Sequence, residues 1–162
     1  MKLIASLFVL FFANIHPKAQ STNNNYDSVL AKKLNADAYG MKKYYLVLLK
    51  TGPTVISDKA KLDSIFNGHM KNIHRLASQN KLVVAGPLGK NDNNYEGIFI
   101  LNTDNKKEAE AMIETDTAVQ SKILSAEYYL YYGSASLQQI LEMHIKIQQK
   151  HFKFIAKKMP SL

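Results

Sequence analysis

The sequence has 162 residues, of which 46% are hydrophobic, and a formal net charge of +8 from 21 basic and 13 acidic side chains. This length and apolar content predict one globular domain with a buried core. Cysteine is absent, which excludes disulfides, thiol nucleophiles, thiolate metal sites and a lipid-anchoring cysteine.

The N-terminal segment has the pattern of a secretory signal. A short basic start is followed by an apolar run from Leu3 to Ala13 and then by small and polar residues. The run is too short to span a bilayer, which takes about 20 residues, but it fits the core of a signal peptide. We expect residues 1–19 to be a signal peptide, cleaved after Ala19, and the mature chain to be exported to the periplasm or secreted. An uncleaved membrane anchor is the alternative.

Residues 20–38 are predicted to form a polar leader and a short helix. The leader shows no periodicity, whereas Val29, Leu30 and Leu34 lie on one side of the helix. Gly40 provides a stop signal after it. We expect this helix to cover part of the domain that follows.

The central part of the chain alternates strands and helices. Runs of β-forming residues bounded by Gly, Pro or Asn predict the strands, and apolar residues three or four apart predict the helices. Their order is that of the α+β ferredoxin-like fold, β-α-β-β-α-β, with an antiparallel sheet and both helices on one face. The predicted strands are residues 43–49, 81–85, 95–102 and 126–132, and the predicted helices are residues 59–79 and 103–116.

Polar residues mark the ends of these helices. Ser57 or Asp58 is expected to cap the first helix, and Asn80 is expected to follow it in the left-handed conformation. Thr103 or Asp104 is expected to open the second helix. The narrow apolar face of the second helix consists of Ala109, Met112 and Ile113.

The fourth predicted strand is rich in tyrosine. Side chains alternate between the two faces of a strand, so at least two aromatic rings lie on each face. A sheet face that carries aromatic rings and is not covered by helices needs a partner. We expect a homodimer through this open face, with ligand binding as the alternative. The tyrosines are Tyr128, Tyr129, Tyr131 and Tyr132.

Residues 134–162 are predicted to form a C-terminal amphipathic helix, which starts at Ser136. Its lysines lie mostly off its apolar stripe. We expect it to dock on the domain or on a second subunit, and contact with an anionic membrane surface is the alternative. His144 and His151 do not have the four-residue spacing that helical metal pairs prefer, so we interpret both as surface residues.

His69 lies on the apolar stripe of the first predicted helix, so its ring should point towards the core. A titratable ring in that place is either a catalytic group or a core histidine whose nitrogens are hydrogen-bonded. His74 points about 140° away from His69 on the helix, which predicts an exposed or edge position and no joint metal site. The stripe consists of Leu62, Ile65, Phe66, Ile73 and Leu76.

Familiar motifs of metal sites, nucleotide-binding loops and hydrolases are missing: the sequence contains no HExxH, GxGxxG, GxxxxGK[ST] or GxSxG. We expect no metal and no cofactor. Basic residues cluster in the C-terminal segment and not among the strand aromatics, so we expect no nucleic-acid partner.

The helix with His69, the strand LVVAGP, the strand YEGIFIL and the turn GluThrAsp that ends in Asp116 resemble the YCII-related (YciI-like) family over residues 39–133. The resemblance implies a ferredoxin-like domain that dimerises into an α/β barrel with a small-molecule pocket. It also implies a catalytic His-Asp dyad, because the histidine and the aspartate of the family fall on His69 and Asp116. Haem binding is suggested only by analogy with other dimeric α/β barrels.

Four further residues are expected to bind the substrate. Tyr44 or Tyr45 is expected to reach the pocket, since alternate residues of the first strand face the same side of the sheet. Gly86 and Pro87 follow the second strand, where their loop is expected to line the pocket mouth.

The sequence departs from the family at three places. Thr117 follows the aspartate where the family has proline, so we expect a looser turn around Asp116. Lys122 stands where the family often has glycine. Leu130 and Tyr131 replace a proline-tryptophan pair, which changes the pocket wall or the dimer contact.

A His-Asp dyad suits proton transfer. A carboxylate that accepts the proton of one imidazole nitrogen fixes the tautomer and leaves the other nitrogen free as an acceptor. We therefore predict a lyase or isomerase acting on a small enolisable or aromatic ring, without a covalent intermediate. The alternative is a non-catalytic ligand-binding or envelope-associated module in which His69 is structural.

Overall fold

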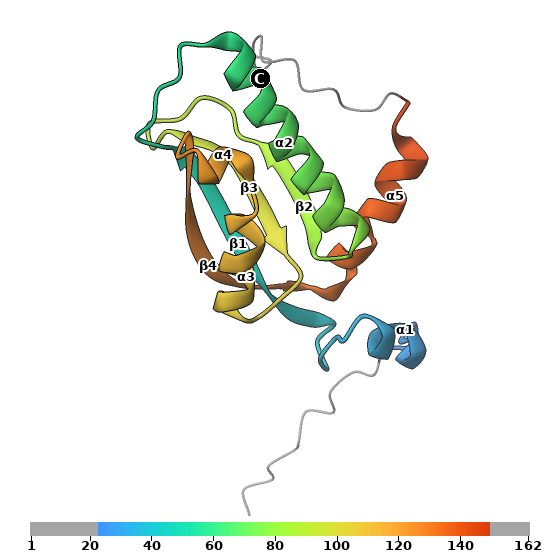
Figure 1. Cartoon of the computed structure of the whole chain (residues 1–162). Helices are drawn as coiled ribbons and strands as arrows, with labels where there is room; N and C mark the ends of the chain where they lie inside the picture. Colours follow the sequence, from blue (N-terminus) through green and yellow to red (C-terminus); the bar gives the residue numbers. More distant parts are fainter. Residues whose placement is uncertain (1–22, 150–162) are drawn as a thin grey trace, which may run out of the picture.

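The computed structural model describes residues 23–149, which form a four-stranded sheet with helices on one face (Figure 1). The strands lie in the order β2-β3-β1-β4, and neighbouring strands are antiparallel. This order is that of a ferredoxin-like β-α-β-β-α-β fold, so the predicted fold class is confirmed. The elements are α1 Ser28–Lys33, β1 Met41–Thr51, α2 Lys59–Ser78, β2 Leu82–Pro87, β3 Tyr95–Leu101, α3 Lys106–Glu114, α4 Thr117–Gln120, β4 Leu124–Ser134, the 3-10 helix η1 Ala135–Gln139 and α5 Ile140–Ile147.

Both ends of α2 are set by the residues that the sequence predicts. The Asp58 side chain accepts hydrogen bonds from the backbone N–H groups of Ala60 and Lys61, at 2.9 and 3.2 Å. These bonds pair N–H groups that have no partner inside the first turn of the helix. Asn80 follows the last turn with φ at 55°, in the left-handed region that asparagine tolerates.

The start of α3 differs from the prediction. Asn105, and not Thr103 or Asp104, caps the helix by accepting from the N–H groups of Lys107 and Glu108. The Thr103 hydroxyl instead donates to the Glu108 carboxylate at 2.6 Å and accepts from the Asn105 N–H at 3.1 Å. Thr103, Asp104 and Asn105 all have side chains that can cap a helix. The positions of the end of β3, at Leu101, and of the start of α3, at Lys106, make Asn105 the capping residue.

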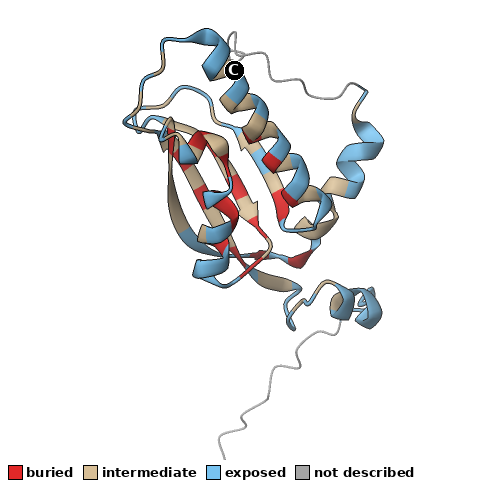
Figure 2. Cartoon of the chain, viewed as in Figure 1, coloured by how far each residue is buried: buried red, intermediate tan, exposed pale blue. Residues whose placement is uncertain are grey.

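The core lies between the sheet and the pair α2 and α3, where Figure 2 shows the buried residues. Every second residue of the central strands faces this layer, as the two-residue period of a strand requires. Removing this apolar surface from water is the main stabilising contribution to the fold. The fully or nearly fully buried members are Val47, Leu49, Leu76, Leu82, Phe99, Leu101, Ala109, Met112, Ile113, Ala118 and Leu124.

The opposite face of the sheet is covered at one corner only. Tyr44 lies on this face because its neighbour Tyr45 packs against the core. Tyr44 is nevertheless completely buried, and its hydroxyl donates to the carbonyl oxygen of Ser134 at 3.0 Å. The rest of the face exposes aromatic rings, with Tyr129 48% and Tyr131 37% exposed.

Lys42 joins the segments before and after the sheet. Its Nζ donates to Asn102 Oδ1 at 2.6 Å and to Gln138 Oε1 at 3.4 Å. The Gln138 amide in turn donates to the carbonyl oxygens of Leu34 and Ala135, at 2.6 and 3.1 Å. One lysine and one glutamine therefore tie the segment after α1 and the 3-10 helix η1 to the start of β1.

The segments at both ends of the domain differ from their predictions. The helix α1 buries none of its residues and leaves Val29 78% exposed, so it does not cover the domain. The C-terminal segment begins as a 3-10 helix, and α5 ends at Ile147, since Gln148 has an extended backbone. The predicted signal peptide, His151 and the end of the predicted C-terminal helix lie outside the described residues. Within residues 23–149, no helix has the length and apolarity needed to cross a bilayer.

Candidate active site

His69 sits in the middle of α2 with its ring against the sheet. It is 9% exposed, in line with its place on the apolar stripe. The ring stacks on Phe99 of β3, with centroids 5.9 Å apart and planes at 22°. Phe66, one turn earlier on α2, meets the ring edge-on at 6.1 Å. Two aromatic side chains therefore hold the imidazole in one orientation.

Asp116 lies in the short connection between α3 and α4 and has no exposed surface. Its Oδ1 accepts from the Ala118 N–H at 2.9 Å, so the side chain caps α4. Its Oδ2 lies 2.7 Å from Nδ1 of His69, which is 47 residues away in the sequence. The fold thus brings together the two residues that the sequence analysis assigned to a dyad.

The charge of Asp116 follows from its neighbours. Burial raises the pKa of Asp116, but the hydrogen bond and charge of His69 and the bonds from Ala118 and Asn72 lower it, and the net pKa is below the ordinary value. The ionised carboxylate therefore accepts the proton of His69 Nδ1, a bond that fixes the tautomer of the neutral imidazole in which the lone pair is on Nε2.

Nε2 of His69 is the free end of the pair. Among the residues that the structure describes, Nε2 has no hydrogen-bond partner, yet no buried polar side-chain atom is left unpaired. Nε2 therefore keeps some contact with solvent. A ring nitrogen with a lone pair, a fixed tautomer and an accessible position is suited to accept a proton.

Three polar residues that the sequence analysis did not assign to the site extend it. Asn72 Nδ2 donates to Asp116 Oδ2 at 3.3 Å, and Arg75 Nη2 donates to Asn72 Oδ1 at 2.7 Å. The Thr115 hydroxyl lies within 2.9 Å of Asn72 Oδ1 and 2.8 Å of Arg75 Nη2. The sequence signal for this set is the spacing of His69, Asn72 and Arg75, three residues apart on one helix.

The turn that holds Asp116 is tied to α2. The Thr117 hydroxyl donates to the Ile65 carbonyl oxygen at 2.7 Å. This bond and the cap at Ala118 fix the backbone on the C-terminal side of Asp116. The expected looser turn at Thr117 is thus held to α2 by a side-chain hydrogen bond that a proline could not make.

The four predicted substrate-binding residues lie on both faces of the sheet. Tyr45 and Pro87 are on the face of Phe99, since Tyr45 pairs with Leu101 and Pro87 pairs with Gly97. Tyr44 and Gly86 are on the opposite face, and the Tyr44 hydroxyl is bonded to Ser134. The structure therefore does not place all four beside His69, and their role in ligand binding stays a prediction.

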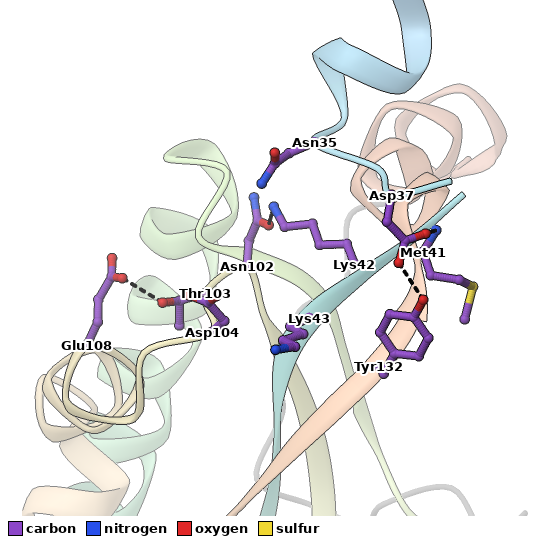
Figure 3. Close-up of a pocket in the computed structure, with 10 residues that line it drawn as sticks. All are labelled: Asn35, Asp37, Met41, Lys42, Lys43, Asn102, Thr103, Asp104, Glu108 and Tyr132. Atoms are coloured by element: carbon purple, nitrogen blue, oxygen red, sulfur yellow. Dashed lines mark hydrogen bonds between the residues drawn. The ribbon is translucent and has the colours of Figure 1, made fainter. Parts of the chain in front are cut away.

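A hollow of about 440 Å³ lies at the other end of the domain and includes neither His69 nor Asp116 (Figure 3). Lys42 and Lys43 line it together with several carboxylates. Two of these carboxylates are hydrogen-bonded inside the protein: Asp37 accepts from the Tyr132 hydroxyl and Glu108 accepts from the Thr103 hydroxyl. Because both positive and negative side chains line this hollow, its charge favours neither an anionic nor a cationic ligand.

The other histidines that the structure describes, His74 and His144, do not form a metal site. His74 and His144 are exposed, as predicted for each. Within residues 23–149, no three side chains of His, Asp or Glu come close enough together to hold a metal ion.

No protein-family model and no curated protein matches the sequence. Among solved structures, the chain is similar to 5-chloro-2-hydroxyhydroquinone dehydrochlorinase from Burkholderia phenoliruptrix, determined in complex with 2,5-dihydroxybenzoquinone. The two share 19% sequence identity with a TM-score of 0.37, over 54% of this chain and 90% of that chain.

Proposed function

We propose that His69 and Asp116 form a proton-transfer site in an exported, YCII-like protein that acts on a small enolisable or aromatic molecule as a lyase or isomerase. The observation that carries the proposal is the 2.7 Å contact between His69 Nδ1 and the buried Asp116 Oδ2, which leaves Nε2 without a hydrogen-bond partner among the described residues. Buried titratable pairs with one free nitrogen are typical of general acid-base sites.

The chemistry of the pair is a relay of one proton. Nε2 of His69 takes a proton from an acidic C–H or O–H group of the substrate, and the electron pair of that bond stays on the substrate. The resulting imidazolium is stabilised by the Asp116 carboxylate beside it. Return of the proton to another substrate atom gives an isomer. In a lyase reaction, the electron pair of the broken C–H or O–H bond forms a new double bond while a leaving group departs with the pair of its own bond, and the imidazolium then gives its proton to the leaving group or to water. Phe66 and Phe99 present flat apolar surfaces beside the imidazole.

A second candidate is a non-catalytic binding or structural module. It is favoured by the small exposure of His69 and by the hydrogen bonds that join Asp116 to Asn72 and Ala118. In that case the pair serves to hold the α3–α4 connection on α2, and Nε2 has no chemical role.

The two candidates are separated by substitution at both members of the pair. We suggest His69→Gln and Asp116→Asn, with His74→Gln as the control because His74 is an exposed histidine on the same helix. Each variant is tested for melting temperature and for binding to a panel of small phenols and lactones by ligand-observed NMR. Loss of binding in both variants with a melting temperature close to that of the wild type supports the proposal. Equal binding by all variants, or no binding by the wild type, supports the structural module.

The proposal includes a homodimer through the exposed part of the sheet face. Tyr129 and Tyr131 of β4 are the largest exposed groups on this face. On the neighbouring strand β1, Leu46 pairs with Tyr129, and Leu48 lies on the same face two residues further along. An apolar sheet face of this kind is stabilised by a second sheet packed against it. Sedimentation as a monomer at micromolar concentration would contradict this part of the proposal.

Export is also part of the proposal and is supported by the sequence pattern of residues 1–19. Expression of the full chain with a C-terminal tag, followed by N-terminal sequencing of the fraction outside the cytoplasm, is expected to give a chain that begins at Gln20. A chain that remains in the cytoplasm with its first residues intact would refute export.

A further inference from the structure

A ladder of polar side chains joins α2 to the connection between α3 and α4. His69, Asn72 and Arg75 follow one another at intervals of three residues on α2, and they face Thr115 and Asp116. Residues three apart on a helix are neighbours on its surface, so the three side chains form one continuous row. The row ends at Arg75, which is exposed, and begins at His69, which is buried.

The amide of Asn72 has only one favourable orientation in this ladder. Its Oδ1 accepts from Arg75 Nη2 at 2.7 Å, and its Nδ2 donates to Asp116 Oδ2 at 3.3 Å. Rotating the amide by 180° would put its oxygen against the carboxylate and its NH2 group against the guanidinium. Both contacts would be repulsive, because guanidinium is only a donor and carboxylate is only an acceptor.

Arg75 is the hydrogen-bond donor that fixes the orientation of the Asn72 amide. The Thr115 hydroxyl also lies close to Asn72 Oδ1, at 2.9 Å, but its single proton is shared with the Met112 carbonyl oxygen at 2.6 Å. Arg75 Nη2 has two protons and directs them to Asn72 Oδ1 and to Thr115 Oγ1, at 2.7 and 2.8 Å. A charged surface residue thereby fixes a neutral buried amide.

Two donors meet on the same carboxylate oxygen. His69 Nδ1 and Asn72 Nδ2 both bond Oδ2 of Asp116, while the Ala118 N–H bonds Oδ1. The Ala118 bond alone would let the carboxylate rotate about its bond to the Cβ atom. The Asn72 bond limits this rotation because it holds Oδ2, the oxygen that faces the His69 imidazole.

We infer that Asn72, oriented by Arg75, is a positioning residue that holds the Asp116 carboxylate against His69 Nδ1. Its significance for catalysis rests on the proposed proton transfer at His69. The inference goes beyond the dyad because it makes the orientation of two buried groups depend on an exposed arginine.

The test uses Asn72→Leu, which keeps the shape of the side chain and removes both its donor and its acceptor. The first readout is the rate at which the His69 Nδ1 proton exchanges with solvent at neutral pH, measured by NMR on protein labelled at histidine with nitrogen-15. His69→Gln assigns the resonance, and His74→Gln is the control. We expect exchange about tenfold faster in Asn72→Leu, which is the factor that corresponds to roughly one hydrogen bond. The second readout is the titration of the Asp116 carboxyl, which should move to higher pH because the Asn72 hydrogen bond lowers the pKa of this group.

The backbone amide of Val47 separates positioning from general destabilisation. Val47 is fully buried in the core, so its exchange rate reports global opening. The inference is overturned if the His69 proton exchanges as in the wild type, or if the Val47 amide accelerates by the same factor. If Asn72→Leu does not fold, the double variant Arg75→Met/Thr115→Val replaces it, because both residues are exposed and both lie beside Asn72 Oδ1. This double variant should also accelerate exchange of the His69 Nδ1 proton and move the Asp116 titration to higher pH, but by less than Asn72→Leu.

These measurements need no substrate. An accelerated His69 proton in a protein that binds none of the phenols or lactones would leave the positioning role standing and remove the proposed function. Ligand binding that depends on His69 but is unaffected by Asn72→Leu would leave the proposed function standing and remove the positioning role.

Discussion

Gly68 and Thr117 are in direct contact between α2 and α4: a Cβ atom added to Gly68 would lie 2.5 Å from Thr117 Oγ1 and 2.8 Å from Thr117 Cγ2. A Cβ atom does not approach other heavy atoms so closely, so any residue larger than glycine here would force the Thr117 side chain to move. Gly68 immediately precedes His69, and Thr117 immediately follows Asp116. The contact therefore sets the distance at which the two members of the dyad meet.

The first prediction concerns Gly68→Ala. In the interior of a helix this change usually stabilises by about 0.5–1 kcal/mol, but here the added methyl group must displace α4. We expect the free energy of unfolding in urea to fall by about 1–3 kcal/mol, as is usual when extra volume is forced into a packed site. Gly86→Ala is the control, since a Cβ at Gly86 meets no atom within 4 Å. A Gly68→Ala protein as stable as the wild type would contradict the contact.

The second prediction is that Thr117→Ala partly rescues Gly68→Ala. Alanine at position 117 removes both of the nearest atoms and leaves only the Cβ, at 3.1 Å. Thr117→Ala alone should cost about 1 kcal/mol, because the Ile65 carbonyl oxygen loses its hydroxyl donor. The double variant should therefore be more stable than the sum of the two single effects allows. Strict additivity in urea unfolding would show that the two residues do not press on each other.

The third prediction concerns acid. The pKa of Asp116 is lower in the folded protein than its ordinary value of 3.8, so the unfolded chain binds more protons near that pH. The stability that Asp116 contributes is thus fully present above about pH 4 and is lost as the pH falls below 3.8. Asp116→Asn should lower the free energy of unfolding by about 1–3 kcal/mol at pH 7, and the difference from wild type should shrink as the pH falls below 4. A difference that is constant from pH 7 to pH 3 would contradict the direction of the shift.

The fourth prediction tests the junction at Lys42. Lys42→Met keeps the length of the side chain but leaves the amide oxygens of Asn102 and Gln138 without their charged donor. We expect faster hydrogen exchange in the segments around Leu34 and η1, with little change at the dyad. Lys43→Met, an exposed neighbour, is the control. Uniform exchange rates in both variants would show that Lys42 does not hold the two segments.

The fifth prediction addresses the dimer. Tyr129→Glu places a charge on the exposed sheet face, and burying it against a second subunit without a partner is costly. Leu130→Glu is a matched control, because Leu130 is the next residue of β4, is 57% exposed and points to the other face. We expect sedimentation to show a dimer for Leu130→Glu and a monomer for Tyr129→Glu. Equal behaviour of the two variants would remove the proposed interface.

Local patterns predicted the frame of the molecule. The strand and helix order, the cap at Asp58 and the left-handed Asn80 depend on residues that are close together in the sequence, and the structure has all of them. The position of His69 on an apolar stripe also predicted its burial. Pairing it with Asp116 needed the family resemblance, since no local pattern connects residues 47 positions apart.

The rest of the site depends on tertiary contacts. Asn72 and Arg75 are residue types that usually lie on a helix surface, and only the approach of the connection at Thr115 makes them partners. The C-terminal helix was predicted to be continuous because its apolar residues recur at helical spacing. In the structure the segment instead begins as the 3-10 helix η1, in which Gln138 is hydrogen-bonded to Lys42 and to the Leu34 carbonyl oxygen. A periodic pattern does not reveal these contacts.

The ladder on α2 runs from a buried histidine to an exposed arginine, so we expect the dyad to respond to ionic strength although Asp116 is fully buried and His69 is only 9% exposed. Salt screens exposed charges far more than buried ones. Added salt therefore screens the Arg75 guanidinium at the exposed end of the ladder, while the short contact between Asp116 and His69 is little affected. Arg75 is thus the point where dissolved ions meet a row of hydrogen bonds that continues to the buried carboxylate.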